Sequence, residues 1–191
     1  MSHIPSTASS SSNFLAVFNA ALETYEKKTK SKLLTHPLAA QLQLCDSPDA
    51  ILSVLQHLVQ QFDQRGSGDS RLRDWLNPTV NILYTFSAVI GSGVALIYSP
   101  ANVIFAGIGV LLLVAKDVDA SHETLIDIFK RMEHFFKRLE SYMAVSSTTG
   151  MTQVIVEILV EVLGILAIAT KEVKERLPKV SEEASWQERY R

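Results

Sequence analysis

Apolar residues recur at steps of three and four positions over most of the chain, which is the spacing of amphipathic α-helices. A first helix is predicted from Asn13, a suitable N-cap residue, to Lys30. Its apolar face carries Phe14, Val17, Phe18, Ala21, Leu22 and Tyr25, and its polar face carries Glu23, Glu26, Lys27 and Lys30. Residues 1–12 are rich in Ser and small side chains, so we expect a disordered leader before this helix.

Prolines delimit the next two helices. The segment 33–44 is broken at His36-Pro37 and can hold only a short helix that carries Leu38 and Leu42. Ser47-Pro48 is a helix start, because Ser is a capping residue and Pro is well tolerated at the first helical position. The face of that helix is formed by Ile51, Leu55, Leu58, Val59 and Phe62. Residues 65–70 then form a polar, turn-rich break that is too short to separate two domains.

Between Asp74 and Lys116 the chain carries no charged residue. Asn77-Pro78 and Ser99-Pro100 read as two helix starts, so the stretch predicts an apolar hairpin with arms 78–98 and 101–116. Neither arm shows a polar face, so both are expected to be enclosed. Small residues should let the arms approach closely, namely Ser87, Ala88, Gly91, Ala95, Ala106 and Gly109.

An uncharged arm of about 20 residues is also long enough to span a bilayer. Polar side chains such as Tyr84, Ser92 and Asn102 make it less apolar than a typical span, and the second arm is short. The flanking amphipathic helices also need an apolar partner. A buried hairpin is therefore favoured over a constitutive anchor, with exposure after a switch left open.

Two more long helices follow. The helix between Lys116 and Tyr142 carries mixed charges and faces inward with Leu125, Ile128, Phe129, Met132, Phe136 and Leu139. Whether it continues from the preceding helix is open. A last helix should run from about Met151 to Leu177, and Pro178 ends it. The result is an all-α fold, a single helical bundle over residues 13–177 with four to five long helices and two short ones around the central apolar hairpin.

Composition and motifs exclude several classes of function. The formal net charge is -2, without the basic excess of a nucleic-acid-binding domain, and a single cysteine, Cys45, fits a reducing, cytoplasmic location. No two histidines stand four residues apart as metal ligands would, and the glycine pairs at 91–93 and 107–109 lack the third glycine of a phosphate loop. No nucleophile motif is present either. We therefore expect neither an enzyme nor a bound metal or cofactor.

Several stretches resemble the fungal STAND N-terminal Goodbye domain, found at the front of NLR-like receptors. They are Phe18-Asn-Ala-Ala-Leu-Glu-Thr-Tyr25, Leu34-Thr-His-Pro-Leu38, Cys45-Asp-Ser-Pro-Asp-Ala-Ile-Leu52, Leu76-Asn-Pro78, Ser99-Pro100 and Ile104-Phe105. The resemblance extends over about 14–176 and implies a signalling or effector domain, normally followed by a nucleotide-binding oligomerisation module. Residues 178–191 would then be a mobile tail or a linker toward that missing module. The architecture is distantly similar to the HeLo and mixed-lineage kinase-like bundles of regulated cell death, and no catalytic residues are carried over.

This resemblance suggests a domain that acts when copies cluster. The first helix is the candidate contact element, because it lies at the edge of the chain and could detach. Its apolar stripe Phe14, Val17, Phe18, Leu22 and Tyr25, together with Lys27, Lys28, Lys30 and Lys32, has the make-up of an interfacial helix. Its partners would be other copies of the chain, an anionic membrane engaged conditionally, or a downstream effector protein, and no nucleic acid.

The simpler interpretation is that the stripe only packs the bundle and the lysines are a solvated face. Under this interpretation the protein would be a protein-interaction adaptor with no membrane activity. This alternative is favoured because the net charge is near zero and the sequence lacks a concentrated basic patch.

Overall fold

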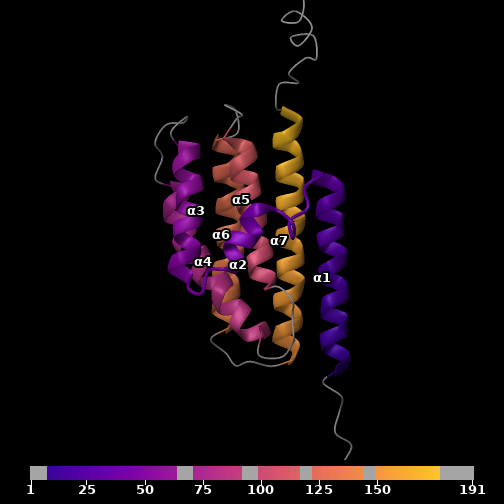
Figure 1. Cartoon of the computed structure of the whole chain (residues 1–191). Coiled ribbons are helices and arrows are strands. Elements are labelled where there is room, and N and C mark those ends of the chain that lie inside the picture. Colours follow the sequence, from indigo (N-terminus) through magenta and orange to yellow (C-terminus); the bar gives the residue numbers. More distant parts are fainter. Residues whose placement is uncertain (1–7, 64–70, 92–98, 117–121, 144–148, 177–191) are drawn as a thin grey trace, which may run out of the picture.

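The computed structural model describes residues 8–63, 71–91, 99–116, 122–143 and 149–176, and these form seven helices and no strand (Figure 1). The helices are α1 (Ala8–Thr29), α2 (Pro37–Gln43), α3 (Pro48–Asp63), α4 (Arg71–Gly91), α5 (Pro100–Ala115), α6 (His122–Met143) and α7 (Thr149–Arg176). The prediction of an all-α bundle is confirmed. Within this part of the chain only α2 is short.

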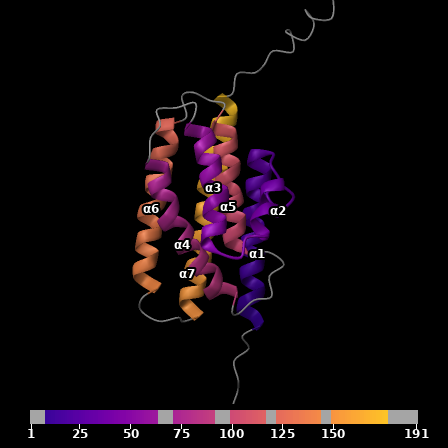
Figure 2. The ribbon, with the colours of Figure 1, turned by 60° about the vertical axis from the view of Figure 1, so that its left-hand side comes forward.

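Helix α5 forms the centre of the bundle. Thirteen of its 16 residues are buried, which requires protein on every side of the helix. It packs most extensively against α7 and also against α2 and α3, while α1 packs mainly against α7. In Figure 2, α6 and α1 lie on opposite sides of the bundle with α5 and α7 between them. The uncharged stretch therefore supplies a core helix, as predicted for its second arm.

The first arm of the predicted hairpin differs from the expectation. Helix α4 begins at Arg71, and Pro78 lies inside it rather than at its start. Leu72, Trp75 and Leu76 are buried, so packing stabilises the two turns before the proline and offsets the missing backbone hydrogen bond.

Helix α4 also has a solvated face, because Asn77, Asn81 and Thr85 are exposed. The prediction that both arms are enclosed is thus right for α5 and wrong for α4 up to Thr85. The side chains of residues 86–98 lie outside the described part.

The glycines of α5 lie against helices other than α4. A Cβ added at Gly109 would collide with Leu38 of α2 and lie 3.1 Å from Leu58 of α3. A Cβ at Gly107 would lie 3.1 Å from Leu166 of α7. Gly109 admits α2 and α3, so its expected role between the two hairpin arms was wrong, and Gly107 admits α7. Ser87, Ala88, Gly91 and Ala95 fall outside the described side chains.

Several helix ends match local signals. The Ser47 hydroxyl accepts a hydrogen bond from the Ala50 N–H at 3.3 Å, as expected of an N-cap. Helix α5 ends at Ala115 and α6 begins at His122, so these are two separate helices. Helix α1 begins at Ala8, so residues 8–12 are helical instead of belonging to a leader, because extending a helix is far easier than starting one. Residues 1–7 and 178–191 lie outside the described residues.

Candidate functional site

Most of the apolar stripe of α1 is part of the core. Phe18, Leu22 and Tyr25 are buried, and α1 lies along α7 (Figure 1). Val17 stays 42% exposed at the edge of this contact. Phe14 belongs to α1, but its side chain is not among those described. The stripe is therefore a packing face in this folded state, as the simpler interpretation held.

Tyr25 forms the polar centre of the α1–α7 contact. Its hydroxyl lies 3.5 Å from the Thr170 Oγ1, and its carbonyl accepts a hydrogen bond from the Thr29 Oγ1 at 2.9 Å. Burial raises the pKa of Tyr25 to about 12, against the opposing effect of its hydrogen bonds. The phenol is thus held neutral inside this interface.

The four candidate lysines lie at the C-terminal end of α1. The side chains of Lys27, Lys28, Lys30 and Lys32 are all exposed. Lys27 forms a surface ion pair with Glu23 at 3.8 Å, a contact that adds little stability in water. Lys30 has a positive φ of 58° and ends the helix in the left-handed conformation that commonly closes helices. Their role as a contact surface stays a prediction.

A fifth lysine, from α7, holds this end of α1 in place. The Lys174 Nζ donates hydrogen bonds to the Thr29 carbonyl and to the Ser31 Oγ, both at 2.7 Å. Partial burial lowers the pKa of Lys174. The Thr29 carbonyl would otherwise lack a partner within α1, so Lys174 caps that helix from another element. Sequence reasoning missed this role, because 145 residues separate the two groups.

His36 completes this corner of the molecule. Its Nδ1 accepts a hydrogen bond from the Leu38 N–H at 3.2 Å and so caps α2. Burial, and then the positive charge of Lys174, lower the pKa of His36. The cap requires an unprotonated Nδ1, and both causes favour that form.

The parallel course of α1 and α7 creates a basic pole. Both helices end at the same side of the molecule (Figure 1), where helix dipoles favour cations. Seven basic residues stand in segments 23–32 and 171–176 against four acidic ones. The basic pole comprises Lys27, Lys28, Lys30, Lys32, Lys171, Lys174 and Arg176, and the acidic residues are Glu23, Glu26, Glu172 and Glu175. The fold thus gathers two segments that are far apart in the sequence into one pole with an excess of three basic residues, of which Lys27 and Lys171 form surface ion pairs with Glu23 and Glu175.

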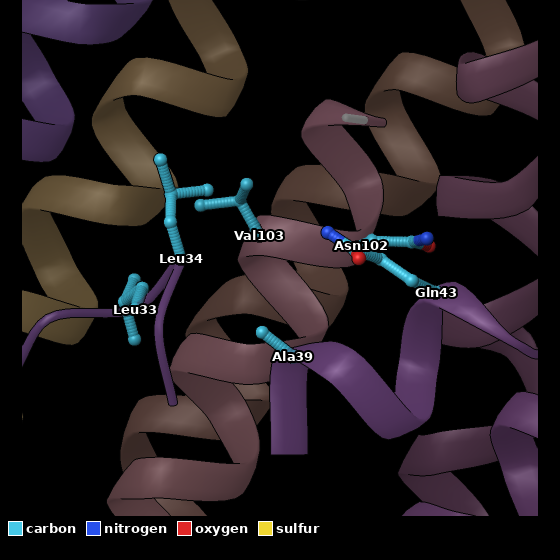
Figure 3. A pocket seen from close by; sticks show the side chains of 6 residues that line it. All are labelled: Leu33, Leu34, Ala39, Gln43, Asn102 and Val103. Atoms are coloured by element: carbon cyan, nitrogen blue, oxygen red, sulfur yellow. The ribbon is translucent and has the colours of Figure 1, made fainter. Parts of the chain in front are cut away.

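A small pocket lies between the segment after α1, helix α2 and the start of α5. The pocket in Figure 3 is lined by Leu33, Leu34, Ala39, Gln43, Asn102 and Val103, and its cavity volume is about 10 Å³, roughly that of one water. Within the same residues, no cluster of three or more His, Cys, Asp or Glu side chains could hold a metal ion. None of the helices in this part of the chain has the length and apolarity needed to cross a membrane.

Comparison with known families identifies one relationship. The sequence profile of the fungal STAND N-terminal Goodbye domain matches residues 18–142, more than half of the chain. This range begins at the buried Phe18 of α1 and extends into α6. No curated protein and no solved structure matched the chain.

Proposed function

The chain belongs to the family of fungal STAND N-terminal Goodbye domains, and we propose that it is the non-enzymatic signalling domain of an NLR-like receptor that acts in regulated cell death or innate immunity. In this proposal, clustering of several copies is the trigger, and the clustered domains engage an anionic membrane. The family match supports the N-terminal receptor role. The membrane step is inferred from the surface of α1 and α7.

The basic pole is the observation that carries the proposal. Lys27 and Lys28 of α1, and Lys30 and Lys32 just after it, are exposed. Each basic residue near an anionic membrane surface contributes about 1 kcal/mol of attraction. The four glutamates nearby reduce that attraction, so one copy would bind weakly. Several copies held side by side combine their affinities, which makes binding depend on clustering.

Helix α1 is the element that could then enter the membrane interface. It packs mainly against α7, so its release would leave the packing of α5 on α2 and α3 intact. Release exposes Phe18, Leu22 and Tyr25, at about 2 kcal/mol each or about 6 kcal/mol together. Burying the same side chains at the lipid boundary would offset that cost.

The test compares the free domain with the domain fused to a heterologous oligomer, on vesicles of phosphatidylserine and phosphatidylcholine. We expect binding and dye leakage only from the clustered form. Replacing Lys27, Lys28, Lys30 and Lys32 by glutamate should weaken binding about tenfold or more. The matched control reverses Lys130, Arg131 and Lys137, exposed basic residues of α6 on the opposite side of the bundle (Figure 2), and should bind normally.

Hydrogen exchange on bound vesicles separates release of α1 from binding of the intact bundle. Release predicts faster exchange at the α7 amides that α1 covers, whereas docking of the intact bundle would leave them protected. If the quadruple lysine variant binds as well as the parent protein, the basic pole is not the contact surface.

The alternative is an adaptor that contacts a downstream protein and never a membrane. The burial of Phe18, Leu22 and Tyr25 favours it, because an apolar stripe already used in packing needs no lipid partner. Failure of the clustered domain to bind anionic vesicles would support this adaptor role.

A further inference from the structure

Gly164 lies in the middle of α7. Among the glycines of α5 and α7 whose surroundings are described, it is the one that packing within the bundle does not explain. Gly107 and Gly109 admit side chains of neighbouring helices. A Cβ added at Gly164 would meet no atom of the described chain within 4 Å, apart from the helix's own nearby backbone and the glycine's chain neighbours. Glycine weakens a helix interior relative to alanine, so its presence here calls for a reason outside the domain.

Gly164 lies in the middle of a solvent-facing seam along α7. The seam members stand at alternating steps of three and four residues, the spacing of helices that pair side by side. The seam comprises Val154, Glu157, Glu161, Gly164, Ile168, Lys171 and Glu175. All are exposed except Gly164, which is half-buried, and the apolar Ile168 is 50% exposed.

We propose that this seam pairs with the same seam of a second copy, in an antiparallel arrangement that crosses at Gly164. The absence of a side chain there would let the two helix backbones approach closely. Glu157 lies seven residues before Gly164 and Lys171 lies seven residues after it, which places both on the same face of the helix.

The charges select the direction of pairing. In an antiparallel pair that crosses at Gly164, Glu157 of each copy faces Lys171 of the other. Lys171 forms an exposed ion pair with Glu175 of its own helix at 3.6 Å, and because such surface pairs are weak it can exchange this partner for Glu157 of the other copy. In a parallel pair Glu157, Glu161 and Lys171 would each face the same residue of the other copy, and these like charges would repel. The facing of Glu157 and Lys171 therefore favours a second copy in the antiparallel direction over one in the parallel direction.

The antiparallel arrangement has a consequence for the basic pole. The poles of the two paired copies point in opposite directions, so both cannot face one membrane. The pair is a resting form that competes with membrane-bound clusters, and its existence does not depend on the membrane proposal. A single helix crossing buries a small area, so the pair is weak and is measured at high protein concentration.

Sedimentation equilibrium of the purified domain, up to about 1 mM, tests the pairing. We expect a monomer–dimer equilibrium that Gly164→Arg weakens by about tenfold or more, with an unchanged helical circular dichroism spectrum. The matched control is Gln56→Arg on the exposed face of α3, which should dimerise normally. A parent domain that stays monomeric, or a dimer that survives Gly164→Arg, overturns the proposal.

Charge reversal tests the direction. Glu157→Lys and Lys171→Glu should each weaken the dimer, and the two together should restore it, because the double variant forms the same ion pairs with reversed signs. Failure of the double variant to recover while both single variants are impaired rules out the antiparallel register.

Vesicle binding tests whether the pair is a resting form. The clustered Gly164→Arg domain should still bind anionic vesicles, whereas loss of that binding would mean that the seam does not belong to a resting form. Vesicle binding and sedimentation thus report separately on the two proposals.

Discussion

Ionisation of Tyr25 should weaken the α1–α7 contact at alkaline pH. The Tyr25 side chain is 0% exposed, and its pKa is raised from 10.0 to about 12 by burial. A group whose pKa is higher in the folded state stabilises the protein below the unfolded-state pKa. That stability is lost as the pH rises through the folded-state pKa.

The magnitude follows from the two pKa values. At pH 11 an unfolded chain has ionised most of its tyrosine at this position, whereas the folded chain still binds the proton. The difference amounts to about 1.4 kcal/mol of lost stability at pH 11, approaching about 2.7 kcal/mol above pH 12. Tyr25→Phe abolishes the effect and loses only a long hydrogen bond to Thr170, which is worth about 1 kcal/mol or less at neutral pH.

Urea unfolding of the parent protein and of Tyr25→Phe, measured between about pH 8 and about pH 11, gives the two free energies of unfolding. Comparing the two proteins at each pH cancels the titration of the other ionisable groups. We expect the phenylalanine variant to become the more stable one as the pH approaches 11. A difference between the two proteins that stays constant over this range would show that Tyr25 is not buried as a neutral phenol.

Three further substitutions test the core and the surface. Gly164→Ala should raise the free energy of unfolding by up to about 1 kcal/mol, because the added methyl meets open space and alanine favours the helix; a lower melting temperature would contradict this. Thr79→Val should stabilise the domain by about 1 kcal/mol, because the buried Thr79 Oγ1 has no hydrogen-bond partner among the described residues, and denaturant unfolding measures the gain. Leu111→Asp should unfold the domain, since Leu111 is fully buried in α5 and an unpaired carboxylate there costs several kcal/mol; a retained cooperative melt would place Leu111 outside the core.

The candidate site was only partly predictable from the sequence. The residues of α1 and their periodicity indicated a helix with one apolar face and a lysine-rich end, and the structure shows both. Whether the apolar face was packed or free could not be read from that pattern, because an interfacial helix and a bundle helix share it. Burial of Phe18, Leu22 and Tyr25 decided for packing in the folded state.

By itself, the sequence determined where helices form and which one lies in the core, because periodicity, caps and missing charges act over one or a few helical turns. Pro78 shows the limit of such signals, since packing of Leu72, Trp75 and Leu76 extended α4 before it.

Only the tertiary structure decided which face meets which neighbour. Gly109 admits Leu38 of α2, and Lys174 reaches the Thr29 carbonyl. Such choices depend on how all the helices fill a common volume together, and a local pattern carries no information about a partner 145 residues away.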